Sequence, residues 1–207
     1  ICTYLLVIIV MKLFTTILFA FLLNSTSFAN AAEDRVREFC DKGEADICTD
    51  LGKYYRDGNA QYQIQKDLTK ALELLTKGCD LGAAEGCNEL GLMHDNGQGT
   101  KKDAAKALSL YQKSCEGGVS AGCLNAAMMY DLGQGVKKDS IKAFGLYQKA
   151  CEGSVGAGCY KLGFKYYKGE GVAKSESNAL KYLSQSCTLK FKDGCEASAQ
   201  LKSGKLK

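Results

Sequence analysis

Cysteine has the widest range of possible chemistry in this chain, and its spacing is regular. The sequence holds 11 cysteines in 207 residues, and all but Cys2 form pairs with seven residues between the members. The pairs are Cys40 with Cys48, Cys79 with Cys87, Cys115 with Cys123, Cys151 with Cys159, and Cys187 with Cys195. Two thiols this close can bind a metal ion, provide a reactive thiolate or join as a disulfide.

The spacing favours disulfides over the other two possibilities. Cysteine metal sites use a closer C-x2-C spacing or add histidines, and His94 is the single histidine of the chain. The paired cysteines leave no orphan thiol, which is typical of an exported protein. We therefore predict a disulfide within each pair, no metal site and no cofactor, and an oxidised cysteine cannot act as a nucleophile.

Other residue types do not form a catalytic set. An acylating serine would need Ser-x-x-Lys with Ser-Asp-Asn and Lys-Thr-Gly partners, and none of these patterns occurs. His94 occupies the place that Tyr55, Tyr130 and Tyr166 fill after the other cysteine pairs, which favours a packed side chain over a catalytic base. The sequence therefore identifies no catalytic residue.

The elements that position the cysteines repeat with them. The first cysteines lie 39, 36, 36 and 36 residues apart, a period typical of a stacked repeat array. Three, four and seven residues after each second cysteine, small or apolar residues recur on one stripe of a helix. The members are Leu51, Gly52 and Tyr55; Leu90, Gly91 and His94; Ala126, Ala127 and Tyr130; and Leu162, Gly163 and Tyr166.

A second helix completes each unit. Glycines such as Gly97 and Gly133 suit the end of the first helix, and Asp67, Asp103, Asp139 and Ser175 suit the start of the second. The sequence thus predicts an all-α array of antiparallel helix pairs, each of about a dozen residues, with one disulfide at every junction. The three extra residues of the first unit fall in the link 58–66.

The ends of the chain differ from the array. Residues 1–31 resemble a signal peptide with its start at Met11, residues 1–10 lying upstream, and Cys2 absent from the mature protein. A retained membrane helix is the alternative if the apolar run 13–23 is joined to residues 4–10. We assign 32–195 to the repeat array and 196–207 to a half-repeat cap with a basic tail, in a secreted or periplasmic protein with no membrane attachment after cleavage.

The charge is mild. A net charge of +4 does not indicate a nucleic-acid partner. The lysines gather in the links, for example Lys101, Lys102, Lys137 and Lys138, and near the end of the chain. A solvated face explains them, and attraction to acidic cell-surface polymers is the alternative.

The motifs of the unit resemble the Sel1-like repeat, a relative of the tetratricopeptide repeat. The matching residues are Ala-Gly-Cys-x3-Ala-x2-Tyr in 121–130, Gly-Gln-Gly-Val-Lys-Lys-Asp in 133–139 and Ala-Phe-x-Leu-Tyr-x-Lys-Ala in 143–150. With the cysteine pairs, they resemble the secreted helicobacter cysteine-rich proteins over about residues 36–200. The resemblance implies a right-handed superhelical α-solenoid, and a β-lactamase activity of penicillin binding and slow hydrolysis.

The same resemblance implies a concave groove lined by the first helices. Positions one, five and eight after the second cysteine would face it, which include Thr49, Lys53 and Arg56 in the first unit and Tyr167 in the last. The predicted groove residues are Asn88, Leu92, Asp95, Leu124, Met128, Asp131, Tyr160 and Phe164. Burial between adjacent units is the alternative. We expect a monomer whose groove binds a peptide, a peptidoglycan fragment or a β-lactam, or else a non-catalytic scaffold for host or envelope proteins.

Overall fold

The computed structural model describes residues 34–206. The predicted signal peptide and Cys2 lie outside this range. Within it, no helix combines the length and the apolar character that crossing a membrane requires.

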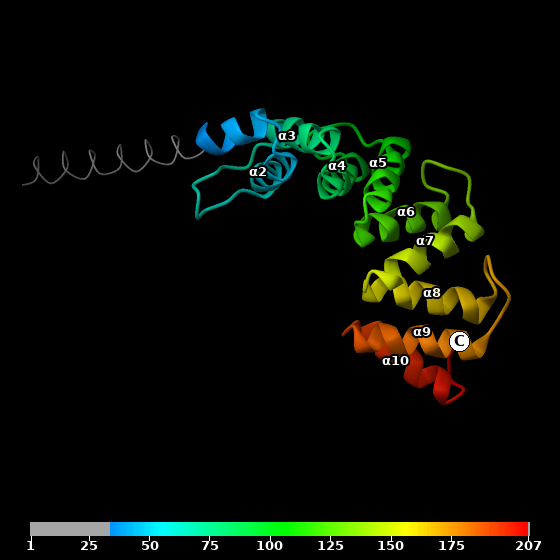
Figure 1. The fold of residues 1–207 in the computed structure, drawn as a ribbon. Coiled ribbons are helices and arrows are strands. Elements are labelled where there is room, and N and C mark those ends of the chain that lie inside the picture. The colour runs from blue at the N-terminus through cyan, green and yellow to red at the C-terminus, as the bar shows by residue number, and fades with distance from the viewer. Residues whose placement is uncertain (1–33, 207) are drawn as a thin grey trace, which may run out of the picture.

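The described chain is helical, with no strand beyond one isolated bridge between Asn59 and Ile64. A helical segment over 34–41 precedes nine longer helices, which Figure 1 shows as a curved array. They are α2 Ala45–Asp57, α3 Leu68–Asp80, α4 Ala84–Asn96, α5 Ala104–Glu116, α6 Ser120–Leu132, α7 Ser140–Glu152, α8 Gly156–Lys168, α9 Glu176–Thr188 and α10 Lys192–Lys202. The all-helical prediction is confirmed. We call α2, α4, α6, α8 and α10 the A helices, and α3, α5, α7 and α9 the B helices.

Side chains and glycines set the helix ends as the sequence predicts. Asp67, Asp103 and Asp139 accept hydrogen bonds from main-chain N–H groups in the first turn of a B helix, and Ser175 does so for α9. Gly97 follows α4 with a φ of 69°, in the left-handed region that glycine adopts without strain, and α6 and α8 end in the same way.

The predicted stripe forms the core of each unit. In α4, the buried side includes Cys87, Leu90, Gly91 and His94. A Cβ atom on Gly91 would lie 2.7 Å from Cε1 of Tyr111, a buried ring in α5. Glycine at this place therefore lets the two helices of the unit approach closely.

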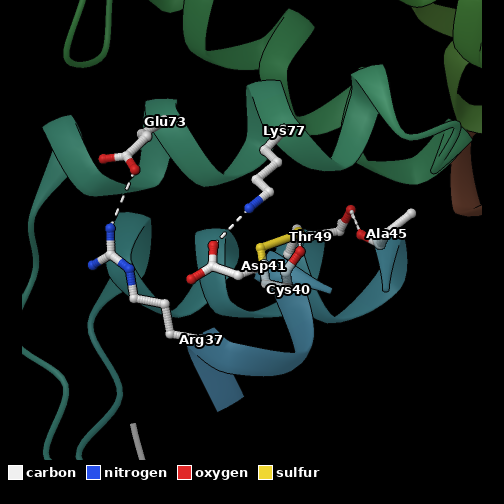
Figure 2. Close-up of a disulfide and its surroundings, with 8 residues drawn as sticks. Arg37, Cys40, Asp41, Ala45, Thr49, Glu73 and Lys77 are labelled. Atoms are coloured by element: carbon white, nitrogen blue, oxygen red, sulfur yellow. Dashed lines mark hydrogen bonds and ion pairs between the residues drawn. A yellow bond between two sulfur atoms is a disulfide. The ribbon is translucent and has the colours of Figure 1, made fainter. Parts of the chain in front are cut away.

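Disulfides join all five predicted cysteine pairs in the described chain. Their Cα–Cα distances lie between 4.4 and 4.8 Å, within the range of ordinary disulfides. Figure 2 shows the first, Cys40–Cys48, which ties segment 34–41 to α2. Beside it, Asp41 pairs with Lys77 of α3 at 2.6 Å and Arg37 pairs with Glu73 at 3.2 Å.

The helices stack in two layers along the arc of Figure 1. The helices α4, α6 and α8 each pack on the B helix of their own unit and on the preceding B helix, while α2 packs on α3 and α10 on α9. A helices also pack on each other across units, as in α2 on α4 and α8 on α10, whereas the B helices make no comparable contacts among themselves. These contacts between A helices fit the predicted concave side of the array, and we call the surface that the A helices form the inner face.

Candidate functional site

The candidate site is the inner face of the A helices, where α4, α6 and α8 carry the eight predicted groove residues. Asn88 is buried and the other seven are half-buried. Leu92, Leu124 and Met128 also pack against the core cluster that runs from the second to the fourth unit. The fold thus brings these residues into one layer, and their role as a groove stays a prediction.

Position one after the second cysteine belongs to the contact between units in the first half of the array. Thr49 of α2 is buried, and a Cβ atom on Gly86 of α4 would lie 2.6 Å from its Oγ1, which donates to the carbonyl of Ala45 at 3.1 Å. Asn88 accepts a hydrogen bond from Nδ2 of Asn125 in α6, at 3.0 Å. For these two residues the alternative of burial between units describes the structure better than an open groove does.

Ion pairs cross between the first two A helices. Arg56 of α2 pairs with Glu89 of α4, and both side chains are largely buried. Lys53 pairs with Glu85 at 2.8 Å. Hydrogen bonds to Asp57 and Glu89 raise the pKa of Arg56 against the opposing effect of burial. Charged groups on this part of the inner face are therefore already paired.

A buried lysine between α6 and α8 is a feature that the sequence prediction missed. The Lys165 side chain is 4% exposed and pairs with Asp131 of α6 and, at 2.9 Å, with Glu170. Burial alone would lower the pKa of Lys165, but the two hydrogen bonds outweigh it and the pKa is raised. The signal was a lysine at the position that Met93 and Met129, both buried, occupy in the two preceding units.

Aromatic side chains gather on α8. Tyr160 and Phe164 lie 4.9 Å apart between ring centroids, and Phe191 lies 5.5 Å from Tyr160. Tyr167, one turn further along, donates from its hydroxyl to the carbonyl of Leu206 at 2.8 Å. The last described residues of the chain, which follow α10 without helical structure, therefore rest against this aromatic row.

His94 is packed, as predicted from its place in the stripe. It is 5% exposed, and its Nδ1 has no hydrogen-bond partner in the described chain. Burial, together with the charge of Lys106, lowers the pKa of His94. A neutral, covered imidazole is poorly placed to take a proton from a substrate.

The described residues contain no group of three or more histidine, cysteine or acidic side chains that could hold a metal ion. The ten cysteines in this range are all in disulfides. What the inner face offers is half-buried apolar and aromatic surface with carboxylates at its edge, which suits binding of another chain.

A match to a family model identifies the repeat. The model of the Sel1 repeat matches four times, over residues 45–82, 84–119, 120–155 and 156–191. The chain is a Sel1 repeat protein. Each match covers one A helix with its B helix, and α10 follows the last of them.

Solved structures support the family and the fold. Helicobacter pylori cysteine rich protein B is 34% identical, with 67% of this chain and 97% of that chain covered and a TM-score of 0.52. This Sel1 protein therefore belongs to the same family as that protein, as its motifs predict. A Sel1 repeat protein from Oxalobacter formigenes has a TM-score of 0.73 at 24% identity, with 83% of this chain and 67% of that chain covered.

A third structure is c5321, a protective antigen of uropathogenic Escherichia coli strains with the same class of fold. It is 28% identical with a TM-score of 0.71, and 75% of this chain is covered. This Sel1 protein spans about a third of the length of that antigen, since 33% of it is covered. A comparison with curated proteins found no match.

Proposed function

We propose that this Sel1 protein is an exported binding module that holds an extended peptide segment of another protein on the inner face of its A helices. The five disulfides of the described chain fit an oxidising compartment, extracellular or periplasmic. Helical repeat arrays of this kind provide extended inner surfaces for binding.

The contact between Tyr167 and Leu206 carries this proposal. The main chain at Leu206 is not helical, and its carbonyl accepts the Tyr167 hydroxyl at 2.8 Å. Tyr167 occupies position eight after Cys159, one of the positions that we predicted to face the groove. The chain turns after α10 at Gly204, and a non-helical main-chain carbonyl thus lies where we place the ligand.

The composition of the inner face favours a peptide with apolar side chains. Leu92, Leu124, Met128, Tyr160 and Phe164 are half-buried and succeed one another along three A helices. Such a row can take alternate side chains of an extended peptide, while polar groups at its edge bond the peptide main chain. Hydrolysis of β-lactams, in contrast, rests on the family resemblance alone.

The test uses two matched substitutions in α6. Peptides are selected from a random library on the disulfide-intact protein and titrated by fluorescence anisotropy. Met128→Glu places a carboxylate in the apolar row and is expected to weaken binding at least about tenfold. Leu132→Glu adds the same charge to the same helix at a side chain that is 68% exposed, and is expected to leave binding unchanged.

Equal affinity of both variants and the unchanged protein would remove the inner face as the binding site. Nitrocefin turnover by the same preparation is measured in parallel. Turnover without any peptide binding would favour the hydrolase over the binding module.

A further inference from the structure

We propose that this Sel1 protein has a second binding surface, a ladder of lysines along the edge of the array that binds a linear anionic polysaccharide. The edge consists of the links between A and B helices, residues 58–67, 97–103, 133–139 and 169–175. We call it the loop edge. It is separate from the inner face, and its ligand is of a different chemical class.

Lysine occurs at one equivalent position in every link. The residue before the capping side chain is Lys66, Lys102, Lys138 or Lys174, and successive members are 36 residues apart. All four are exposed. The two central links add a second lysine, Lys101 or Lys137, and the first turns of α5 and α7 add Lys106 and Lys142.

The main chain holds these lysines in the same conformation in successive units. The residue after the lysine donates its N–H to the end of the A helix, at 2.9 Å for Asp103 to His94 and for Asp139 to Tyr130. The main-chain N atom of the lysine also lies beside the glycine that ends that helix. A Cβ atom on Gly97 or Gly133 would be 3.3 Å from it in both units. The side chains of Lys102 and Lys138 therefore leave the main chain at equivalent positions in the two units.

Adjacent links are also packed into one continuous edge. A Cβ atom on Gly135, in the third link, would lie 2.5 Å from the carbonyl carbon of Ala104 at the start of α5. The link 133–139 thus rests on the first turn of α5, the B helix of the preceding unit, and this turn carries Lys106.

The acidic groups nearby leave this edge with free positive charge. Asp103 and Asp139 accept hydrogen bonds from helix N–H groups. Asp95 lies 3.9 Å from Lys102, and Asp139 lies 4.0 Å from Lys142. In the described chain, Lys101 and Lys137 have no ion pair within 4.0 Å. The pKa of Glu170 in the next link is lowered by its hydrogen bond to Lys165 and, in part, by the charge of Lys138. Exposed ammonium groups in a regular row attract a polymer that carries regularly spaced anionic groups.

The compartment selects the class of polymer. Disulfides place the protein outside the reducing cytosol, where carboxylated and sulfated polysaccharides cover surfaces. Such chains are flexible, linear and charged at regular intervals, so that one chain can contact several units at once.

The experiment measures binding of heparin, as the probe, to the full disulfide-bonded protein by salt elution and by titration. Lys101→Gln with Lys137→Gln is expected to weaken binding about tenfold and to lower the eluting salt concentration. The control, Lys149→Gln with Lys202→Gln, removes the same charge from exposed residues outside the loop edge and is expected to retain most of the affinity. Because all four side chains are exposed, circular dichroism of both variants should match that of the unchanged protein.

Three results would overturn the proposal. One is the same loss of affinity in both variants, which would show an effect of net charge alone. Another is the absence of heparin binding at low salt. The third is tighter binding of single-stranded DNA of equal charge, which would favour a nucleic acid. Peptide binding on the inner face is expected to be unaffected by Lys101→Gln with Lys137→Gln, since neither lysine pairs with a groove residue, so that the two proposals fail independently.

Discussion

Lys165 of α8 and Asp131 of α6 form an ion pair between two A helices, with the ammonium group almost fully covered. Methionine fills the equivalent position in the two preceding units, at Met93 and Met129. The third and fourth units are therefore joined by charge at a place where the earlier ones use apolar packing. A buried charge is tolerated only when it is paired. The Lys165 side chain is more deeply buried than that of Asp131, so loss of the carboxylate and loss of the lysine should affect stability differently.

Removing the carboxylate is expected to cost more than removing the lysine. Asp131→Asn leaves the buried ammonium with Glu170 alone and should lower the free energy of unfolding by about 1–3 kcal/mol. Lys165→Met installs the residue of the two preceding units and leaves carboxylates that reach water, so stability should change by less than about 1 kcal/mol. Urea unfolding of both single variants and the double variant measures this. A larger loss in Lys165→Met than in Asp131→Asn would contradict it.

His94 is expected to make stability fall in mild acid. Burial lowers its pKa in the folded protein below the ordinary value of 6.5. As the pH falls through 6.5, histidine in the unfolded chain takes up a proton that folded His94 does not. The free energy of unfolding is therefore at its full value above this pH and decreases below it. His94→Gln should remove this part of the loss between about pH 7 and pH 5, measured as the melting temperature. An unchanged pH profile would assign the loss to other groups.

The central disulfide is expected to stabilise the whole array. Cys115 and Cys123 close a loop of about nine residues, for which the loop-entropy model gives on the order of 2.5 kcal/mol. Replacing both by alanine should lower the free energy of unfolding by about that amount in denaturant titration. The same change at Cys40 and Cys48 frees only the segment 34–41, so it should loosen that segment and affect the array less. Equal losses in the two variants would argue against this difference.

Two helix glycines are expected to respond in opposite directions to alanine. Gly91→Ala places a methyl group 2.7 Å from the ring of Tyr111, which is 1% exposed and has no room to move, so it should cost about 1–3 kcal/mol. Gly145 in α7 has no atom within 4 Å of such a methyl group. Gly145→Ala should therefore stabilise by about 0.5–1 kcal/mol, because it removes backbone freedom from the unfolded chain. The melting temperatures of both variants test this prediction, and an increase for Gly91→Ala would contradict the packing argument.

Local rules were enough to determine the architecture from the sequence. The 36-residue period, the capping side chains such as Asp103 and the paired cysteines each act within one turn or one unit, so a repeat displays them directly in the sequence. That is why the helix pairs, their ends and all five disulfides of the described chain could be predicted.

Contacts between units were decided only by the tertiary structure. The place of position one on its helix predicts a groove residue, but Thr49 and Asn88 are buried against Gly86 and Asn125 of the next unit. The pairing of Lys165 with Asp131, 34 residues away, likewise depends on how far one unit rotates against the next. Helical periodicity fixes the direction of a side chain from its own axis, while the neighbour that it meets depends on packing between helices distant in sequence.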